Sequence, residues 1–125
     1  MLGMLSAVLF CSATVEPVFE MAAGNATHIR VQVAQEFCLR LRGQISTGYS
    51  WQVAPKDSSP DVVILEIKPE AAPGAGKLLG GGESELWRCR VDSSGRLRLR
   101  LIYVRPWERP LNPARAHDFW IDARE

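Results

Sequence analysis

Side chains able to perform acid–base, nucleophilic or metal chemistry are few and scattered along this chain. The two histidines are His28 and His117, and the three cysteines are Cys11, Cys38 and Cys89. None of them belongs to the closely spaced pair that a metal ion needs, and none stands in a motif for a catalytic nucleophile. No two carboxylates suggest a general acid and its base. We therefore expect neither an enzyme nor a bound metal or cofactor.

The cysteines fit strand structure better than chemistry. Cys89 shares the apolar side of an expected strand with Trp87 and Val91, which indicates a small buried side chain rather than a reactive thiolate. Cys38 falls on the polar side of another strand, among arginines. A disulfide between Cys38 and Cys89 stays an alternative, but it requires a local break in the alternation of side chains.

A short turn between two expected strands has residues suited to contact with another molecule. It is QISTGYSW, residues 44–51, in which Ser46, Thr47 and Gly48 precede the aromatic Tyr49 and Trp51. A turn that only reverses the chain rarely needs this combination. Glycine permits a tight turn, and aromatic side chains supply large contact areas.

Two further loops stand out. KLLGGGESE, residues 77–85, contains Gly80, Gly81 and Gly82, and a glycine run lets the backbone approach another surface closely. Its alternative interpretation is a hairpin tip with no partner.

The third loop is YVRPWERP, residues 103–110. Trp107 follows Pro106 and lies between Arg105 and Arg109. An exposed tryptophan held by prolines is a good interface anchor. The alternative is a tryptophan that folds back onto the core.

The elements that must position these loops are strands. Apolar and polar residues alternate with a period of two over residues 28–33, 37–42, 86–91 and 96–104, and a last strand is expected near residues 118–123. The continuous apolar run 61–67 is expected to be buried on both faces. Turn residues separate the runs, and Trp51 is placed where it would be buried between two sheets. The pattern predicts an all-β fold, an antiparallel sandwich of about seven strands.

Arginines occupy the outward positions of several of these strands. Such a face could bind phosphates, but no aromatic residues alternate with the arginines to stack on bases. The formal net charge is only +1, so we expect no nucleic-acid partner. The arginines are better explained as a solvated surface that protects strand edges.

The 125 residues suffice for one domain preceded by a short leader. Residues 1–15 carry no charge and are apolar over the length of a signal-peptide core, although a basic start is missing. The alternatives are a wrongly assigned start or a buried first strand. The run is too short to span a membrane. We expect a leader at 1–23 and a domain at 24–125, either exported to a secreted, periplasmic or vesicular location or, without cleavage, cytoplasmic.

Three of these segments together resemble a known family. STGYSW, KLLGGGESE and LIYVRPWERP follow one another as do the N-P-T-T-G-[YF]-x-W, G-x-G-G and R-P-W/F loops of the chagasin family of cysteine-protease inhibitors. The resemblance covers about residues 24–125. It implies an immunoglobulin-like sandwich that blocks papain-like cysteine proteases of the cathepsin L or B type, as a monomer and without covalent chemistry.

The resemblance also implies the binding residues. They are Ser46, Thr47, Gly48 and Tyr49 in the first loop, Gly80, Gly81 and Gly82 in the second, and Arg105, Pro106 and Trp107 in the third. The family's Asn-Pro is replaced by Gln44-Ile45, and Glu83 stands where the last glycine would be. The alternative functions are an immunoglobulin-like adhesion or carbohydrate-binding module of an exported protein, and an assembly module that uses the arginine face.

Overall fold

The computed structural model describes residues 16–43, 48–71 and 83–125. Its strands are β1 (Val18–Glu20), β2 (Ala26–Gln32), β3 (Glu36–Arg42), β4 (Ser50–Val53), β5 (Val62–Ala71), β6 (Glu83–Val91), β7 (Gly95–Val104) and β8 (Arg115–Arg124). One turn of 3-10 helix, η2 (Pro55–Asp57), follows β4. Within the described ranges no helix has the length and apolar character needed to cross a membrane.

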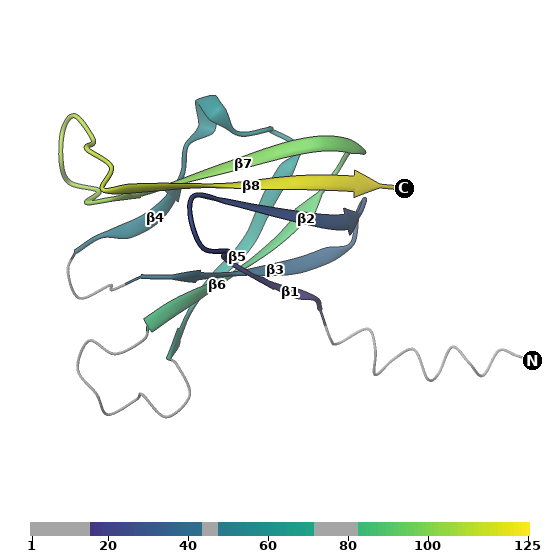
Figure 1. Cartoon of the computed structure of the whole chain (residues 1–125), viewed down its shortest axis with the longest axis horizontal. Helices are drawn as coiled ribbons and strands as arrows, with labels where there is room; N and C mark the ends of the chain where they lie inside the picture. The colour runs from purple at the N-terminus through teal and green to yellow at the C-terminus, as the bar shows by residue number, and fades with distance from the viewer. Residues whose placement is uncertain (1–15, 44–47, 72–82) are drawn as a thin grey trace, which may run out of the picture.

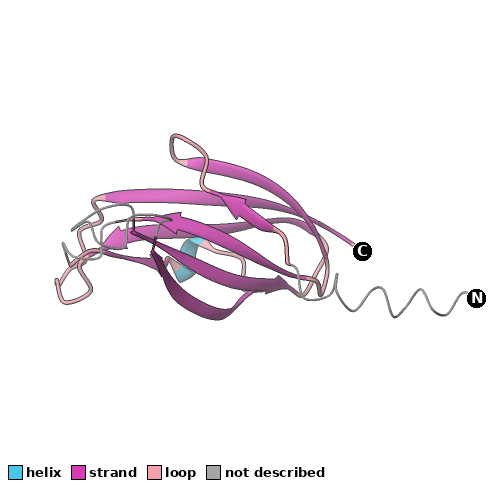
Figure 2. Cartoon of the chain, turned by 90° about the horizontal axis from the view of Figure 1, so that it is seen from below, coloured by secondary structure: helices cyan, strands magenta, loops and turns pink. Residues whose placement is uncertain are grey.

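The strands form two four-stranded sheets packed face to face (Figure 1). One has the order β1-β3-β6-β5 and the other β2-β8-β7-β4. The strands run roughly along the long axis of the molecule (Figure 2). This arrangement confirms the predicted all-β sandwich, with eight strands rather than about seven.

The sheets are mixed rather than purely antiparallel. β1 pairs with β3 and β2 pairs with β8 in parallel, while the other four pairs are antiparallel. Side chains alternate across a strand in the same way in both kinds of pair. The period of the sequence therefore indicates which side chains face inward and carries no information on strand direction.

The core lies between the sheets and consists of the alternating apolar residues of both inner faces. Its largest fully buried apolar side chains are Trp87, Phe37, Phe119, Leu39, Leu41, Leu99, Leu101, Ile121, Val91, Val104 and Cys89. Trp51 is also buried, as the sequence predicts. Burial of this apolar surface is the main force that holds the two sheets together.

The prediction that residues 61–67 are buried on both faces is wrong. They belong to β5, which lies at the edge of its sheet, and Leu65 and Ile67 are 38% and 47% exposed. A register shift between Ile64 and Glu66 interrupts the pairing with β6. Because such a bulge adds one residue to the strand, it breaks the alternation and produces a continuous apolar run without double burial.

The folded part begins before residue 24. β1 pairs with β3, Phe19 packs edge to face against Phe37 at a centroid distance of 6.0 Å, and Met21 is buried. These residues fall within the expected leader at 1–23, because a three-residue strand leaves too short a pattern to detect. Residues 1–15 lie outside the described residues, and their removal stays a prediction.

Most of the outward arginines are paired with carboxylates. Arg40 donates hydrogen bonds to Glu20 and Glu70, and Arg98 and Arg100 both contact Asp118 at 3.0–3.1 Å. Burial alone would raise the pKa of Asp118, but the hydrogen bond from Arg98 and the charge of Arg100 outweigh it and lower that pKa. These networks support the interpretation of the paired arginines as solvated surface.

His117 lies in β8, and it is only 1% exposed. Its Nε2 is hydrogen-bonded to Thr27 Oγ1 at 2.6 Å, and the same oxygen accepts the N–H of Ala22 at 2.8 Å. The imidazole therefore links β8 to β2 and to the residues after β1. Burial lowers the pKa of His117, and the carbonyl of Gly24 offsets this effect in part.

We expect the free energy of unfolding to fall as the pH decreases below about 6.5, the ordinary value for histidine. The folded pKa lies below the unfolded one, so the unfolded state binds more protons in this range and protonation favours it. Urea titrations at pH 7 and pH 5.5 measure how much the free energy of unfolding changes between the two values. The change should be smaller in a His117→Gln variant. An unchanged difference would contradict the assignment of this pH dependence to His117.

Candidate functional site

The three conspicuous loops leave the sandwich at the same end. Arg42, the last residue of β3, pairs with Ser84 near the start of β6, and Ser50, the first residue of β4, pairs with Val104 at the end of β7. Arg115, the first residue of β8, pairs with Tyr103. The strand ends that flank the β3–β4, β5–β6 and β7–β8 connections therefore lie at one end of the sandwich (Figure 1).

The structure describes half of the predicted site residues. Gly48, Tyr49, Arg105, Pro106 and Trp107 lie within the described ranges. Ser46, Thr47, Gly80, Gly81 and Gly82 lie outside the described residues.

An aromatic stack supports the start of β4. The ring of Tyr49 stacks on that of Tyr103 at a centroid distance of 5.2 Å, and the ring of Trp51 lies 4.9 Å from Tyr103. The indole N–H of Trp51 donates a hydrogen bond to the carbonyl of Arg42 at 3.0 Å. This hydrogen bond ties the start of β4 to the end of β3, the two strands that flank the first loop.

Two arginines extend this stack. The guanidinium of Arg105 lies 4.6 Å from the centroid of the Tyr49 ring, and that of Arg115 lies 5.4 Å from Trp51 and 5.7 Å from Tyr103. Cation–π contacts of this kind contribute about 0.5–2 kcal/mol each. Arg105 therefore connects the third loop to the first.

Sequence reasoning did not find Arg115. Its position at the start of β8 gives no signal until β8 is paired with β7, which brings Arg115 beside Tyr103. The contact to the aromatic stack depends on strand pairing, and no motif in the sequence marks it.

Gly48 and Trp107 join the first and third loops. Gly48 has a φ of +87°, and a Cβ built on it would lie 2.6 Å from Cη2 of Trp107. The indole thus lies directly on a backbone that has no side chain. Trp107 is nevertheless 66% exposed, so it is not folded back onto the core. The indole of Trp107 therefore presents a large aromatic surface at this end of the molecule and is supported by the backbone of Gly48.

The described residues contain no reactive group at this end. Cys38 and Cys89 are both free and lie within β3 and β6. Burial raises the pKa of Cys38 to about 11, assisted by its hydrogen bond to Glu16, and burial raises that of Cys89 to about 12. Both thiols are therefore protonated at neutral pH and are poor nucleophiles. No cluster of metal-binding side chains occurs among the described residues.

The chain is similar to known peptidase inhibitors. Residues 30–119 match the model of the chagasin family of peptidase inhibitors, I42. Chagasin of Trypanosoma cruzi is 26% identical over 102 residues, which are 81% of this chain and 93% of that protein.

Two solved structures show the same fold. The cysteine protease inhibitor EhICP2 of Entamoeba histolytica superposes with a TM-score of 0.66 at 21% identity, over 86% of this chain and 95% of that one. PbICP-C, solved in complex with falcipain-2, gives a TM-score of 0.59 at 16% identity, over 86% of this chain and 99% of that one. Because the family model spans most of the sequence, the chain belongs to the chagasin family of peptidase inhibitors.

Proposed function

We propose that this protein inhibits papain-like cysteine proteases reversibly, competitively and without covalent chemistry. Its three loops enter the active-site cleft together from one end of the sandwich. The observation that carries the proposal is the exposed Trp107, supported on Gly48 in the neighbouring loop. The complex of the similar protein PbICP-C with falcipain-2 supports a protease as the partner.

Each loop has a role in this proposal. By resemblance to the family, Ser46 and Thr47 lie against the catalytic Cys–His pair, and the backbone of Gly80, Gly81 and Gly82 lies along one wall of the cleft. Trp107 covers aromatic surface on the opposite side of the cleft. Arg105 keeps the third loop against Tyr49.

The affinity for the protease depends on how well the three loops fit its cleft, because no covalent bond forms with its catalytic cysteine. Three loops of this size bury about 800 Å² on each partner, a standard interface. Only the surplus over the costs of association appears as affinity, so the fit of the first loop and of Trp107 matters more than the area. Gln44-Ile45 and Glu83 depart from the family pattern, and they are the positions where we expect protease preference to be decided.

Inhibition of papain tests this function directly. Stoichiometric titration of papain should abolish its activity, and dilution should restore it. An adhesion or assembly module would leave papain active.

We further expect the inhibitor to bind tightly to a protease whose catalytic Cys is changed to Ala. No step of the proposed mechanism uses that thiol, and a loop without an aligned scissile carbonyl is not cut. Calorimetry measures the affinity, and mass spectrometry after long incubation with active enzyme should find the chain intact between Gln44 and Trp51. Loss of binding to the Cys→Ala protease, or cleavage in this loop, would instead indicate a covalent or substrate-like trap.

A further inference from the structure

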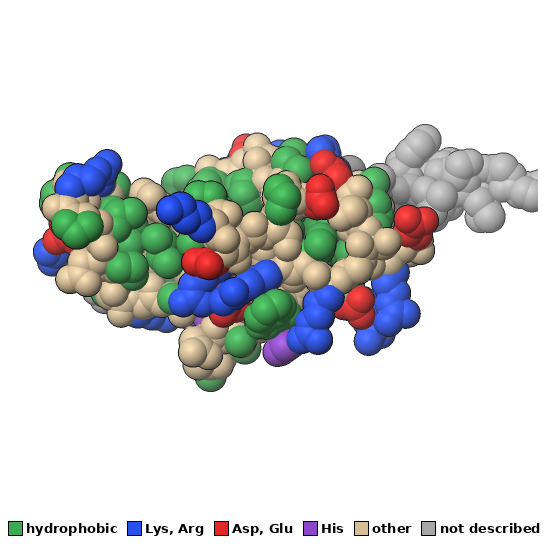
Figure 3. Space-filling view, turned by 90° about the horizontal axis from the view of Figure 1, so that it is seen from above, with side chains coloured by type: hydrophobic (Ala, Val, Ile, Leu, Met, Phe, Trp, Pro, Cys, Tyr) green, Lys and Arg blue, Asp and Glu red, His purple; other side chains and the backbone are tan. Residues whose placement is uncertain are grey.

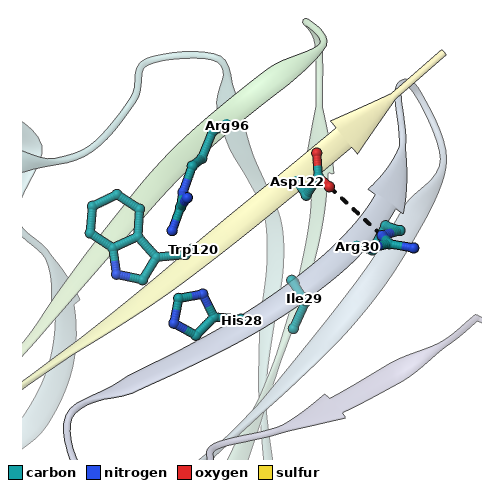
Figure 4. A pocket seen from close by; sticks show the side chains of 6 residues that line it. All are labelled: His28, Ile29, Arg30, Arg96, Trp120 and Asp122. Atoms are coloured by element: carbon teal, nitrogen blue, oxygen red, sulfur yellow. Dashed lines mark ion pairs between the residues drawn. The ribbon is translucent and has the colours of Figure 1, made fainter.

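The outer face of the β2-β8-β7 sheet has an arrangement that inhibition does not use. Two neighbouring rows of outward side chains cross the three strands. The first row consists of Arg98, Trp120 and His28, and the second of Arg96, Asp122 and Arg30. Figure 4 shows His28, Trp120, Arg96, Arg30 and Asp122 around an open space on this face.

Arg96 lies opposite Asp122 but does not pair with it. Its guanidinium lies 5.3 Å from the centroid of the Trp120 ring, and that of Arg98 lies 5.2 Å from the same ring. Asp122 instead contacts Arg30 at 3.7 Å and Arg124 at 3.3 Å. Among the described residues Arg96 forms no ion pair, so its charge is available to a ligand.

Between these rows lies a shallow hollow of about 540 Å³, lined by His28, Ile29, Arg30, Arg96, Trp120 and Asp122. Two arginines and one carboxylate line it, namely Arg30, Arg96 and Asp122, and the nearby Asp118 is already paired with Arg98 and Arg100. Figure 3 shows basic side chains beside a histidine and hydrophobic surface along one side of the molecule. The hollow therefore favours an anionic ligand with an apolar face.

The sequence predicts arginines without aromatic residues among them, since none alternates with them along a strand. The structure shows otherwise. Trp120 comes from the neighbouring strand, and pairing of β7 with β8 brings it between the arginines.

We propose that this hollow binds an acidic carbohydrate unit, a sugar ring that bears a sulfate or carboxylate group. The guanidiniums of Arg96 and Arg30 bind the anionic group, and the part of the Trp120 indole that Arg96 and Arg98 leave uncovered provides apolar surface for the sugar ring. His28 supplies a polar contact at the rim. A nucleic acid is less suitable, because the hollow has one aromatic residue rather than a series and the net charge of the chain is only +1.

The site is separate from the inhibitory end. Trp120 lies five residues along β8 from Arg115, which corresponds to about 17 Å at the rise of a strand. A sugar in the hollow would therefore leave the three loops free, and the protein could hold a protease and an acidic glycan together.

The test is a titration of the ¹⁵N-labelled full chain with a trisulfated heparin disaccharide, followed through the indole signals of its four tryptophans. The signal lost in a Trp120→Phe variant identifies Trp120. We expect this signal to shift saturably while that of Trp107 stays in place. An unsulfated uronic-acid disaccharide distinguishes the carboxylate from the sulfate, and a neutral disaccharide should not bind.

Single substitutions distinguish binding in the hollow from non-specific attraction of an anion to the basic surface. Arg96→Ala and Trp120→Ala should each weaken binding about tenfold, whereas Arg90→Ala, which removes the same charge from the other sheet, should weaken it about twofold or less. Equal effects of Arg96→Ala and Arg90→Ala, shifts centred on other residues, absence of saturable binding, or tighter binding of a short oligonucleotide would each overturn the proposal. Papain inhibition by these variants should be unchanged, so the two functions can fail independently.

Discussion

The Trp107→Ala variant is expected to bind its target protease about 2–4 kcal/mol more weakly, the range of an aromatic hot spot. Since 1.4 kcal/mol is a factor of ten, the inhibition constant should rise by about 30- to 700-fold. The physical reason is that the 66% exposed indole would become buried in the complex and is already held in place by Gly48. Little ordering of the side chain then opposes binding.

We expect Trp107→Ala to leave the fold stable. Trp107 lies on a loop and contributes little buried surface in the free protein, so we expect the free energy of unfolding to change by about 0.5 kcal/mol or less. Trp120→Ala is the matched control, because it removes the same side chain from the outer face of a sheet. Inhibition constants measure binding of both variants to the protease, and urea titrations measure their stability. If Trp107→Ala inhibits normally, or if it unfolds, Trp107 is not the anchor.

The parts of the fold that could be predicted depend on local patterns. Burial of Phe37, Leu39 and Leu41, and of Leu97, Leu99 and Leu101, follows from alternation along single strands. The position of Trp51 in the core follows from the same pattern. Alternation is a property of consecutive residues, so it survives whichever neighbour the strand acquires.

The parts that could not be predicted depend on which strands become neighbours. The parallel pair of β2 with β8 joins segments about ninety residues apart, and no short pattern encodes it. The contacts of Arg115 with Trp51 and of Arg96 with Trp120 arise only from such pairing. The same holds for His117, whose neighbour Thr27 lies in β2.

The candidate site shows the same division. Its loops could be located from their glycine, proline and aromatic residues, and the positive φ of Gly48 agrees with the expected tight turn. The contact of Trp107 with Gly48 could not be predicted, because it joins the connection between β3 and β4, which lie in different sheets, to the loop of the β7–β8 hairpin. Gly48 therefore has a second requirement that the turn alone does not explain.

The Gly48→Ala variant tests this second requirement. A methyl group at this position would lie 2.6 Å from the Trp107 ring, so either the indole or the turn must move. We expect binding to weaken by about 2–3 kcal/mol, comparable with loss of the anchor itself. The positive φ adds about 1 kcal/mol of backbone strain to the folded state.

The chain offers a matched control for the strain. Gly24 has a φ of +89°, almost the value at Gly48, but a Cβ there would meet nothing within 4 Å. Gly24→Ala should therefore lower the free energy of unfolding by a similar amount and leave the inhibition constant unchanged. A loss of inhibition in this control would show that the effect at Gly48 is general destabilisation.

A double-mutant cycle then separates the contact from the turn. In the Trp107→Ala background the ring is absent, so adding Gly48→Ala should weaken binding much less than it does in the native chain. The interaction energy between the two sites should reach about 0.5–3 kcal/mol, the range for residues in contact. Strict additivity would mean that Gly48 acts only through the turn and that Trp107 binds independently of it. A large interaction energy would instead show that the first and third loops act on the protease as one rigid surface.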